Sequence, residues 1–544
     1  LISPCMGARI TMIPTGQPAA PFDNRSALHY TEFVDRSLFY ADGSRDAAVS
    51  LSARRCLVST EHLYKARLSR RQMLGLISGT MAGVALAACT PAGAPAVPAE
   101  AGAAQPAAPS VTTVVVWGKD ATAEGGNKNM IDAFNKTHTD LQIKAESVPA
   151  VAGQSPDQMQ KIMTAIAAGT VPDFFWLDRF LAVDFAARKA IEPLDDYIAA
   201  GTLKRDDFIA ACWDEGNWQG KQWNIPASEG NIGYWSLAYN QDLMTEAGLD
   251  PTTPPRTWEE TKEYALKMTV REGNNIKRIG MVPLWGASFL YQWAWSNGAH
   301  LVDEEGRKVT MTDPKVVETL EFLVKFYDDL GGAENIQAFQ AGFQSAANDP
   351  FLTGLVGQVI YGEYQLPSAA RYKPDLNMAV TWFPSPKEGD PKVSWVGGWS
   401  WAIPRGSKQP APAYQAMEWL AGEEGLMAFQ DGQDALFRKE GGVWIPLIAA
   451  HKKANDMGRE KYLPALKEKS PSVAAAYEFY YNAPQTYDKL YFRPKVLVAS
   501  LLWEAQLKSA QEACYKQKTA IEALTEWEGK VQAALDEAWQ KLEA

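Results

Sequence analysis

The chain has 544 residues and a formal net charge of −11, with 46% hydrophobic and 22% charged residues. This composition is typical of a globular protein, and the length predicts two or more domains, because a single hydrophobic core rarely serves more than ~300 residues. The acidic balance argues against nucleic acid as a partner, since phosphate binding needs a surplus of lysine and arginine on one face. It does not favour an anionic ligand either.

The cysteines and histidines provide no recognisable metal or catalytic motif. The five cysteines form no CxxC pair and no evenly spaced framework, which argues against a zinc ribbon or a disulfide-dense module. A single bridge between Cys212 and Cys514 stays open. The five histidines show no HExxH spacing, and GxSxG, GxGxxG and P-loop motifs are absent from the sequence. We therefore expect no metal, no cofactor and no catalytic residue.

A basic and apolar segment before residue 90 has the features of an export signal. Arg70 and Arg71 precede an apolar run over residues 73–88, which ends at Cys89. The run is short and glycine-rich for a membrane span, and its order of features is typical of a secretory signal. The twin arginine resembles the twin-arginine export motif, and the sequence LAAC resembles the bacterial lipobox. These resemblances predict a signal peptide over residues 69–88 and a lipid anchor on Cys89; a buried apolar helix with an incidental cysteine is the alternative.

Two segments around this signal are not expected to form a core. Residues 89–110 are rich in alanine and proline and hold almost no large apolar residue, which predicts a disordered tether. Residues 1–68 show no clear periodicity, although export signals begin close to the true N-terminus. We interpret residues 1–68 as an over-extended gene start or a disordered segment.

From residue 111 the pattern alternates between short apolar strands and amphipathic helices. The sequences VTTVVVWG, LQIKAESV and VPDFFWLD predict three strands, and NKNMIDAFNKTH and MQKIMTAIAAGT predict the helices between them. Met130, Ile131 and Phe134 share one face of the first helix, and Gly169 ends the second. This order predicts right-handed crossovers, a parallel sheet and an α/β fold.

Longer helices follow in the second half of the chain. Residues 257–269 begin with a capping-box pattern, Thr257 with Glu260, and residues 313–330 form another helical pattern. The tail over residues 518–544 is expected to be a packing helix. Its apolar side chains at helical intervals are Ile521, Leu524, Val531, Leu535 and Leu542.

Several segments in this order resemble family 1 of the extracellular solute-binding proteins, the maltose-binding type that serves ABC sugar importers, here in a lipoprotein form. The segments include IMTAIAAGTVPDFFWLDRF, IEPLDDYI, GKQWNIPASEGNIGYWSLAYNQDLMTEAGLDPTTPPRTWEE, GLVGQVIYGEYQLPSA and VGGWSWAIPRGSKQPAPAYQAMEWLAGEEG. Each is weak alone from Ile191 onward, but their order and spacing are specific from about Val111 to the C-terminus. Departures are residues 339–351, the aromatic stretch over residues 477–492 and the N-terminal extension.

The resemblance implies a type II periplasmic-binding-protein fold with two α/β lobes, a ligand cleft between them and strands that cross at a hinge. Lobe 1 is expected over residues 111–230 and 395–455, and lobe 2 over residues 231–394 and 456–544. The crossings should fall near residues 225–235, near residues 394–402 and near residue 455.

Aromatic and polar residues at strand ends are the candidate ligand contacts. Sugar rings present an apolar face bordered by hydroxyls, so their binding calls for flat aromatic rings with polar side chains at the edge. Trp176, Asp178 and Arg179 end the third predicted strand, where clefts open in parallel sheets, and resemble the family's stacking and hydroxyl-binding cluster. Core packing of Trp176 and helix capping by Asp178 are the alternatives. Trp117 and Lys119 end the first strand in the same way.

Further candidates follow from the resemblance. Glu229 is expected at the first crossing and Tyr364 at a cleft strand, with a solvated hinge and ordinary sheet packing as their alternatives. Gly397 and Gly398, followed by Trp399, resemble the family's second crossing, where the missing Cβ lets a ligand approach the backbone; a tight bend is the alternative. Tyr291 is a candidate on the far lobe, where it alternates with Trp293 and Trp295 in a pattern that also fits a packed helix or strand face.

The expected function is capture of a sugar or oligosaccharide and its delivery to ABC permease subunits by a monomeric protein. The protein is expected outside the cytoplasmic membrane and anchored to its outer face. A binding protein for a non-sugar solute, such as glycerol phosphate, a polyamine or a peptide, would share the same fold. A secreted polysaccharide-active enzyme is the alternative from another class, since it also needs aromatic rings and paired carboxylates.

Overall fold

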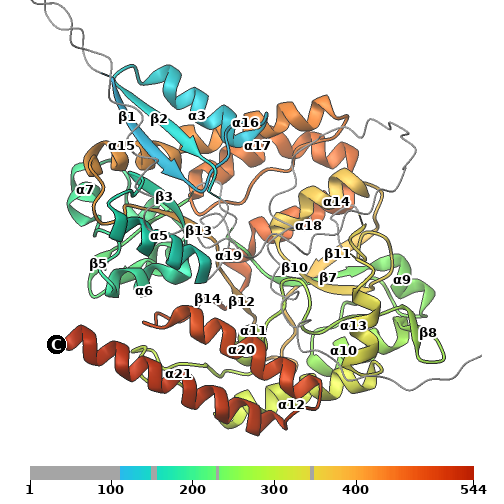
Figure 1. Cartoon of the computed structure of the whole chain (residues 1–544). Coiled ribbons are helices and arrows are strands. Elements are labelled where there is room, and N and C mark those ends of the chain that lie inside the picture. The colour runs from blue at the N-terminus through green and yellow to red at the C-terminus, as the bar shows by residue number, and fades with distance from the viewer. Residues whose placement is uncertain (1–110, 149–155, 228–231, 344–347) are drawn as a thin grey trace, which may run out of the picture. The chain divides into compact units, whose positions relative to one another are not determined.

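A computed structural model describes residues 111–148, 156–227, 232–343 and 348–544 of the chain (Figure 1). The expected export signal with Arg70 and Arg71, the lipidation site Cys89, the tether and the first 68 residues lie outside the described residues, as does Glu229. No helix in the described ranges is long and apolar enough to cross a membrane.

The first predicted strands form a sheet in which β1 lies between β2 and β3. Strands β1 (Thr112–Trp117), β2 (Leu141–Glu146) and β3 (Phe174–Asp178) are parallel, which confirms the sequence prediction. Strands β13 (Trp399–Ala402) and β6 (Ile225–Pro226) extend the sheet, and the described order is β2-β1-β3-β13-β6. Strand β13 is antiparallel to both of its neighbours. All residues of β3 and β13 are buried, as expected for central strands made of apolar and aromatic residues.

Helices cover this sheet. The helix α3 (Gly126–Thr137) buries Met130, Ile131 and Phe134, as its periodicity predicts. Helix α16 packs along α3 (Figure 1). The other helices and turns of this part are α5 (Pro156–Ala168), η3 (Arg179–Leu181), α6 (Ala182–Ala187), α7 (Asp195–Ala200), η4 (Arg205–Asp207), α8 (Ala210–Asp214), α15 (Pro410–Ala421) and α16 (Glu423–Lys439).

A second sheet is antiparallel. Strand β7 (Ser236–Asn240) lies between β10 (Gln358–Tyr361) and β11 (Met378–Thr381). The short strands β12 (Val393–Trp395) and β14 (Lys489–Tyr491) pair in parallel. Two hairpins are formed by β4 (Asn217–Trp218) with β5 (Lys221–Gln222) and by β8 (Val270–Glu272) with β9 (Asn275–Arg278).

The chain passes between the two sheets more than once. It leaves the first sheet after β6 and enters the second at β7, and it re-enters the first sheet at β13, which directly follows β12 of the β12–β14 pair. These passages fall within the ranges expected for the first two crossings. Other helices and turns of the chain are α9 (Gln241–Glu246), α13 (Ala333–Gln340), η6 (Glu363–Gln365), α14 (Leu366–Tyr372), α17 (Lys452–Lys469), α18 (Pro471–Tyr481) and α19 (Ala483–Thr486). The proposed lobe boundaries themselves stay predictions.

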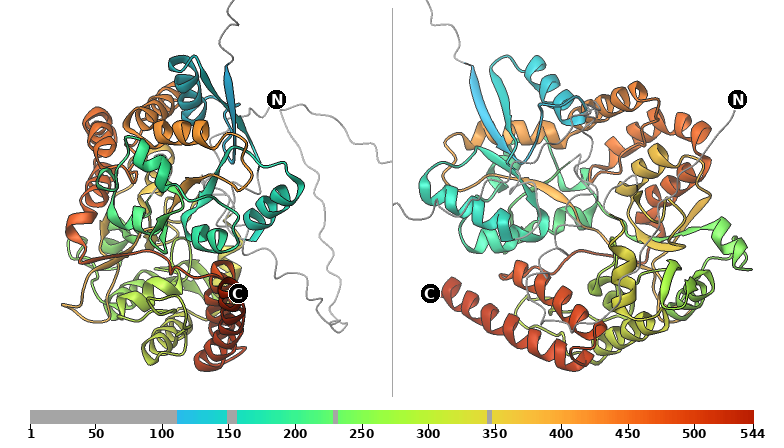
Figure 2. Two further views of the ribbon diagram at one scale, coloured as in Figure 1. Left: turned by 90° about the vertical axis from the view of Figure 1, so that its left-hand side faces the viewer. Right: turned by 45° about the vertical axis from the view of Figure 1, so that its right-hand side comes forward.

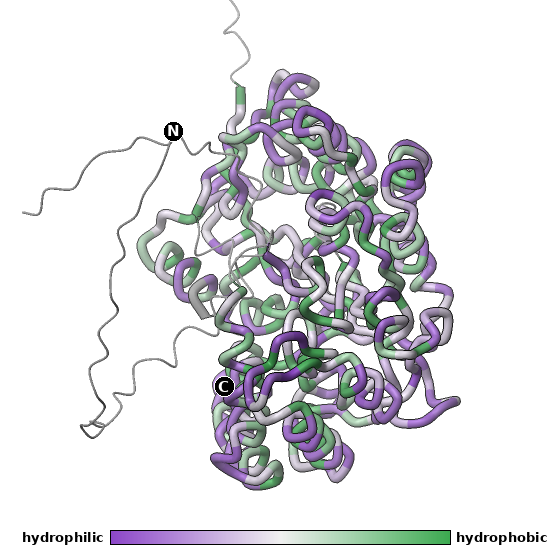
Figure 3. The backbone as a smooth tube through the Cα atoms, turned by 90° about the vertical axis from the view of Figure 1, so that its right-hand side faces the viewer, coloured by the Kyte–Doolittle hydropathy of each residue, from purple (hydrophilic) through white to green (hydrophobic). Residues whose placement is uncertain are grey.

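The remaining helices lie around the two C-terminal helices, which Figure 2 shows from other sides. Helix α20 (Ala499–Cys514) packs along α21 (Ala520–Glu543), and both contact α12 (Pro314–Asp329). Nearby are α10 (Trp258–Met268) and α11 (Leu290–Ser296). The capping box predicted for Thr257 and Glu260 is present at the start of α10. The colour of the tube alternates along many helices in Figure 3, as expected when one face of each helix is buried.

The structure decides two questions about side chains that the sequence analysis raised. The prediction that Ile521 belongs to the packed face of α21 is wrong, because 44% of Ile521 is exposed. At ~100° per residue, Ile521 lies about 80° from the middle of the buried stripe that Ala520, Leu524 and Val531 define. The bridge left open between Cys212 and Cys514 is not formed, since both are buried free thiols.

The contact between α3 and α16 provides a test of the packing. An added Cβ at Gly432 would lie 2.7 Å from the carbonyl oxygen of Gly125, whereas a Cβ at Gly529 in α21 would meet nothing within 4 Å. We expect Gly432→Ala to lower the free energy of unfolding by about 1–3 kcal/mol through overpacking. Gly529→Ala should raise it by about 0.5–1 kcal/mol, because alanine favours a helix interior over glycine. Urea denaturation of both variants measures the difference; equal effects would contradict the tight contact.

Candidate functional site

Three tryptophans gather on one face of the first sheet. In the register of β3 and β13, Trp401 lies opposite Trp176 and Trp399 lies opposite Asp178, so these four side chains share a face. The rings of Trp176 and Trp399 are stacked with centroids 5.4 Å apart, and Trp401 meets Trp176 edge to face at 4.8 Å. All three are buried, and Trp176 is 5% exposed. We call Trp176, Trp399 and Trp401 the tryptophan cluster.

Lys119 adds a cation to this cluster. Its Nζ lies 3.0 Å from the ring centroid of Trp176 and 5.4 Å from that of Trp401. A lysine over an indole face gains electrostatic attraction from the ring quadrupole, and more so when both groups are shielded from water. Trp117, the other candidate at the end of β1, takes different partners, because its indole Nε1 donates to Glu146 at 3.0 Å. Trp117 and Lys119 thus contact different side chains, Glu146 and Trp176.

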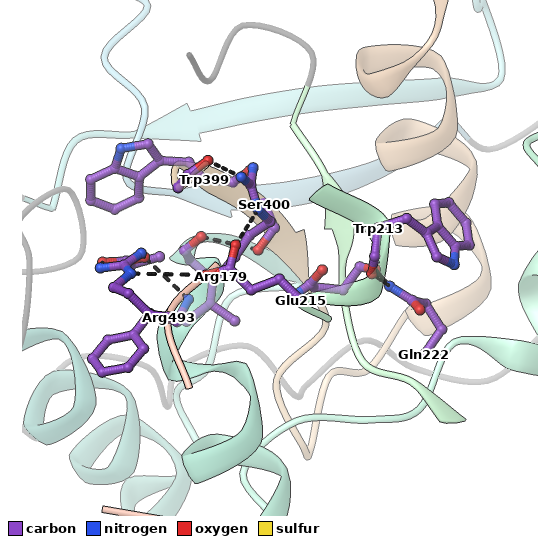
Figure 4. A network of polar contacts seen from close by, with 12 residues as sticks. Arg179, Trp213, Glu215, Gln222, Trp399, Ser400 and Arg493 are labelled. Atoms are coloured by element: carbon purple, nitrogen blue, oxygen red, sulfur yellow. Dashed lines mark hydrogen bonds and ion pairs between the residues drawn. The ribbon is translucent and has the colours of Figure 1, made fainter. Parts of the chain in front are cut away.

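Arg179 is wholly buried beside the tryptophan cluster. Its Nε donates to Glu215 at 2.9 Å, and its terminal nitrogens donate to the backbone carbonyls of Trp399, at 3.0 Å, and Gly397 (Figure 4). The backbone N–H of Arg179 also donates to the carbonyl of Gly398, whose φ of 114° suits glycine. The two glycine carbonyls thus both accept from Arg179, Gly397 from the guanidinium and Gly398 from the backbone N–H.

A second buried arginine binds Asp178. Arg493 donates from both terminal nitrogens to the Asp178 carboxylate, one bond measuring 3.0 Å, and its Nε lies 3.8 Å from Glu215. The Asp178 Oδ1 also accepts the backbone N–H of Phe180 at 3.2 Å. Sequence reasoning missed Arg493, although the aromatic stretch noted as a departure ends one residue before it. Its contacts depend on folding, since 315 positions separate it from Asp178.

These buried charges shift the pKa of their neighbours. Burial raises the pKa of Glu215, against the opposing effect of Arg179 and Arg493. Burial opposes the charged form of Arg179, but Cys212, Glu215 and Asp178 together hold its pKa above the ordinary value. Burial also raises the pKa of the Cys212 thiol, to about 11, so this thiol is protonated at neutral pH.

Glu363 is a second functional candidate that sequence reasoning passed over. Its two carboxylate oxygens accept the backbone N–H groups of Gly233, at 2.7 Å, and Tyr234, at 2.8 Å. These residues belong to the segment that links the two sheets, so Glu363 ties η6 to the first crossing. Burial raises the pKa of Glu363 to about 7, although the two N–H donors favour its charged form.

The remaining candidates lie with other partners. Tyr364 is half-buried beside Glu363, and burial raises the pKa of its hydroxyl. Tyr291 stacks on Trp295 within α11 and on Trp503 of α20, while Trp293 contacts Trp258 and Phe383. The open choice for this segment is therefore settled as a packed helix. The structure brings together Trp176, Lys119, Trp399, Asp178, Arg179 and Gly398.

A metal is not indicated in this part of the chain. Among the described residues, no group of three or more His, Cys, Asp or Glu side chains could hold a metal ion.

Comparison with known proteins assigns the chain to a family. The pattern of the bacterial extracellular solute-binding protein family matches residues 120–427, more than half of the chain. The chain belongs to this family. Members of this solute-binding family are binding proteins outside the cytoplasm, and they are not enzymes.

Several relatives in sequence are described as binding sn-glycerol 3-phosphate. The periplasmic protein UgpB of Pectobacterium atrosepticum is 28% identical over 141 residues, covering 26% of this chain and 31% of that protein. UgpB of Agrobacterium fabrum is 26% identical over 247 residues, covering 43% of this chain and 53% of that protein. The matched part thus spans between about a third and about half of these relatives.

Solved structures extend the likeness over most of the chain. CpMnBP1 with mannobiose bound has a TM-score of 0.64 and 27% identity, covering 77% of this chain and 99% of that chain. The sugar-binding protein MalE of Xanthomonas citri has a TM-score of 0.59 and 18% identity, covering 79% and 99%. The solute-binding chain therefore has the α/β periplasmic-binding-protein fold.

The Glu363 contact predicts a pH effect on stability. The pKa of Glu363 is about 7 in the folded protein and 4.5 ordinarily, so protonation of Glu363 stabilises the folded state. This stabilisation is fully present below about pH 4.5 and is lost as the pH rises through 7. The contribution of Glu363 to the free energy of unfolding should therefore fall by about 3 kcal/mol over this range. Glu363→Gln cannot lose a proton, so its stability should fall less between pH 5 and 7.5.

Urea denaturation of the wild type and Glu363→Gln at several pH values measures this difference. Asp184, whose pKa burial raises to about 6, is present in both proteins and cancels in the comparison. Parallel pH profiles for the two proteins would contradict the assignment.

Proposed function

We propose that this solute-binding protein captures a neutral sugar or oligosaccharide and delivers it to the permease subunits of an ABC importer. The tryptophan cluster at the end of β3, with Lys119 over Trp176, is the observation that carries this proposal. Aromatic faces match the C–H face of a sugar ring, and a nearby cationic donor matches its hydroxyls. Ligand-bound relatives of the same fold include proteins in complex with mannobiose and cycloalternan.

The charges around the cluster favour a neutral ligand over a phosphate. Arg179 and Arg493 already bind Glu215 and Asp178, so these four groups sum to no formal charge. A phosphate would need cations with free donors, whereas the terminal nitrogens of Arg493 donate to Asp178 and the Arg179 guanidinium donates to Glu215 and two backbone carbonyls. Lys119 lies over the ring of Trp176 beside these groups.

Glycerol 3-phosphate is the second candidate because the sequence relatives are described as binding it. On the cell-biological side, we propose export through the twin-arginine signal, a lipid anchor on Cys89 at the outer face of the cytoplasmic membrane, and action as a monomer. We further propose that residues 89–110 tether two lobes that close over the ligand.

A thermal-shift screen tests the ligand class. Mannobiose, mannotriose, maltose and glycerol 3-phosphate are each added to the protein at increasing concentration. We expect at least one saccharide to raise the unfolding midpoint, since a ligand at 100 times its Kd stabilises the native state by about 2.7 kcal/mol. A shift with glycerol 3-phosphate alone would overturn the sugar proposal, and release of shortened saccharides would overturn the binding-protein proposal.

Substitution of Trp176 tests the stacking surface. Trp176→Ala should weaken binding of the saccharide identified in the screen by about 1–3 kcal/mol, the contribution of one large buried ring. Trp176→Phe keeps an aromatic ring and should lose less. Isothermal titration calorimetry measures both.

The matched control is Trp539→Ala, which removes a tryptophan that packs on Arg307 away from β3. Unchanged affinity for both Trp176 variants, with the control also unchanged, would rule out the proposed stacking role.

A further inference from the structure

The ion pair between Asp178 and Arg493 joins two parts of the fold that are far apart in sequence. Asp178 ends β3 of the first sheet, whereas Arg493 follows β14, which pairs with β12. Both side chains are buried, and the pair is bidentate. We infer that Arg493 is a positioning residue of the ligand site, which orients Asp178 and fastens the β14 segment to the end of β3. This inference rests on the proposed function for its effect on ligand affinity.

Arg493 is itself held on several sides. Its guanidinium lies 4.5 Å from the ring centroid of Phe180, 5.3 Å from that of Trp395 and 5.7 Å from that of Trp503. Phe180 belongs to the η3 turn after β3, Trp395 ends β12, and Trp503 lies on α20. The cation therefore lies where the first sheet, the second crossing and the C-terminal helices meet. Aromatic neighbours of this kind restrict a guanidinium and strengthen its electrostatic interactions.

The pair also fixes the direction of the Asp178 carboxylate. Oδ1 accepts from the Phe180 N–H and from Arg493, and Oδ2 accepts from the other guanidinium nitrogen. Removal of Arg493 would leave Arg179 as the remaining cation of the buried group, with Asp178 and Glu215 as its two carboxylates. An uncompensated buried charge is costly, so the local structure would rearrange. Because Trp399 lies opposite Asp178 in the sheet register, this rearrangement would reach the tryptophan cluster.

Arg493 thus acts on the ligand through other residues. Its terminal nitrogens donate to Asp178, and its guanidinium lies among Phe180, Trp395 and Trp503 instead of over the rings of the tryptophan cluster. The consequence for a ligand is a carboxylate that is already neutralised and oriented before binding. Preorganisation of this kind raises affinity because less ordering is left to the binding step.

The test uses the full chain and the variants Arg493→Gln, Arg493→Lys, Asp178→Asn and the double variant Asp178→Asn/Arg493→Gln. Without any ligand, thermal unfolding gives a double-mutant cycle for the pair. We expect the double variant to lose less than the sum of the two single losses, because each single change leaves the other partner buried and unpaired. We also expect Arg493→Gln to shift the tryptophan emission, since Trp395 and Trp503 lie beside the guanidinium.

Calorimetry with mannobiose, or with another saccharide that shifts the wild type in the screen, provides the second arm. Arg493→Gln should weaken binding on the order of tenfold or more at a temperature where it is still folded. Arg493→Lys keeps the charge and should recover part of the affinity. This rescue separates positioning from a purely structural role.

The matched control is Arg459→Gln, which breaks another bidentate pair, with Glu478, on helices α17 and α18. It should have the saccharide affinity and the tryptophan emission of the wild type. Additive losses in the cycle, or an Arg493→Gln variant with wild-type affinity, would overturn the positioning role. A wild type that binds none of the saccharides defeats the proposed function, and the cycle then still decides whether Arg493 positions Asp178.

Discussion

The antiparallel pairing of β13 with β3 is the contact on which the rest of the site depends. It joins segments about 220 residues apart, and it places Trp399 and Trp401 opposite Asp178 and Trp176. Because side chains alternate along a strand, this register also decides which side chains share a face, and a shift by one residue would reverse the assignment. The stacked tryptophans and the carbonyls that receive Arg179 follow directly from it.

Four charged side chains are buried next to this strand pair, and each needs a partner of opposite charge. Isolated ions are costly in a protein interior, so each arginine must be close to a carboxylate. Arg179 meets this need with Glu215 and two backbone carbonyls, and Arg493 meets it with Asp178. Of the two glycines before Trp399, Gly397 accepts from the Arg179 guanidinium and Gly398 accepts from the Arg179 backbone N–H. In this arrangement the positive charges of the two guanidinium groups are balanced by the two carboxylates, Glu215 and Asp178.

The relatives found by sequence and those found by structure are described with different ligands. Sequence relatives are described as binding glycerol 3-phosphate, while solved structures of the same fold are described with saccharides. A shared fold does not specify a ligand, because recognition depends on a few side chains at the strand ends and on the loops around them. For this solute-binding protein the balance of charge around the tryptophan cluster is therefore more informative than its overall similarity.

The local elements could be predicted from the sequence because their signals are local. The β-branched run in β1, the apolar stripe of α3 and the capping box at Thr257 each depend on residues within one element. Trp176, Asp178 and Arg179 could be nominated because they end a predicted strand, and the family followed from ordered segments. Local spacing failed at Ile521, where its position relative to the buried stripe, and not its apolarity, set its exposure.

Tertiary structure alone decided what those nominated residues contact. No periodicity indicates that Arg493 binds Asp178 or that Glu363 accepts N–H groups from the first crossing. Nor does it indicate that the Lys119 ammonium lies over the ring of Trp176. These contacts join positions far apart in the chain, and they form because buried charges and polar groups must find partners once the strands have paired. The sequence by itself determined the elements and the family, and the folded chain determined how charge is distributed around the site.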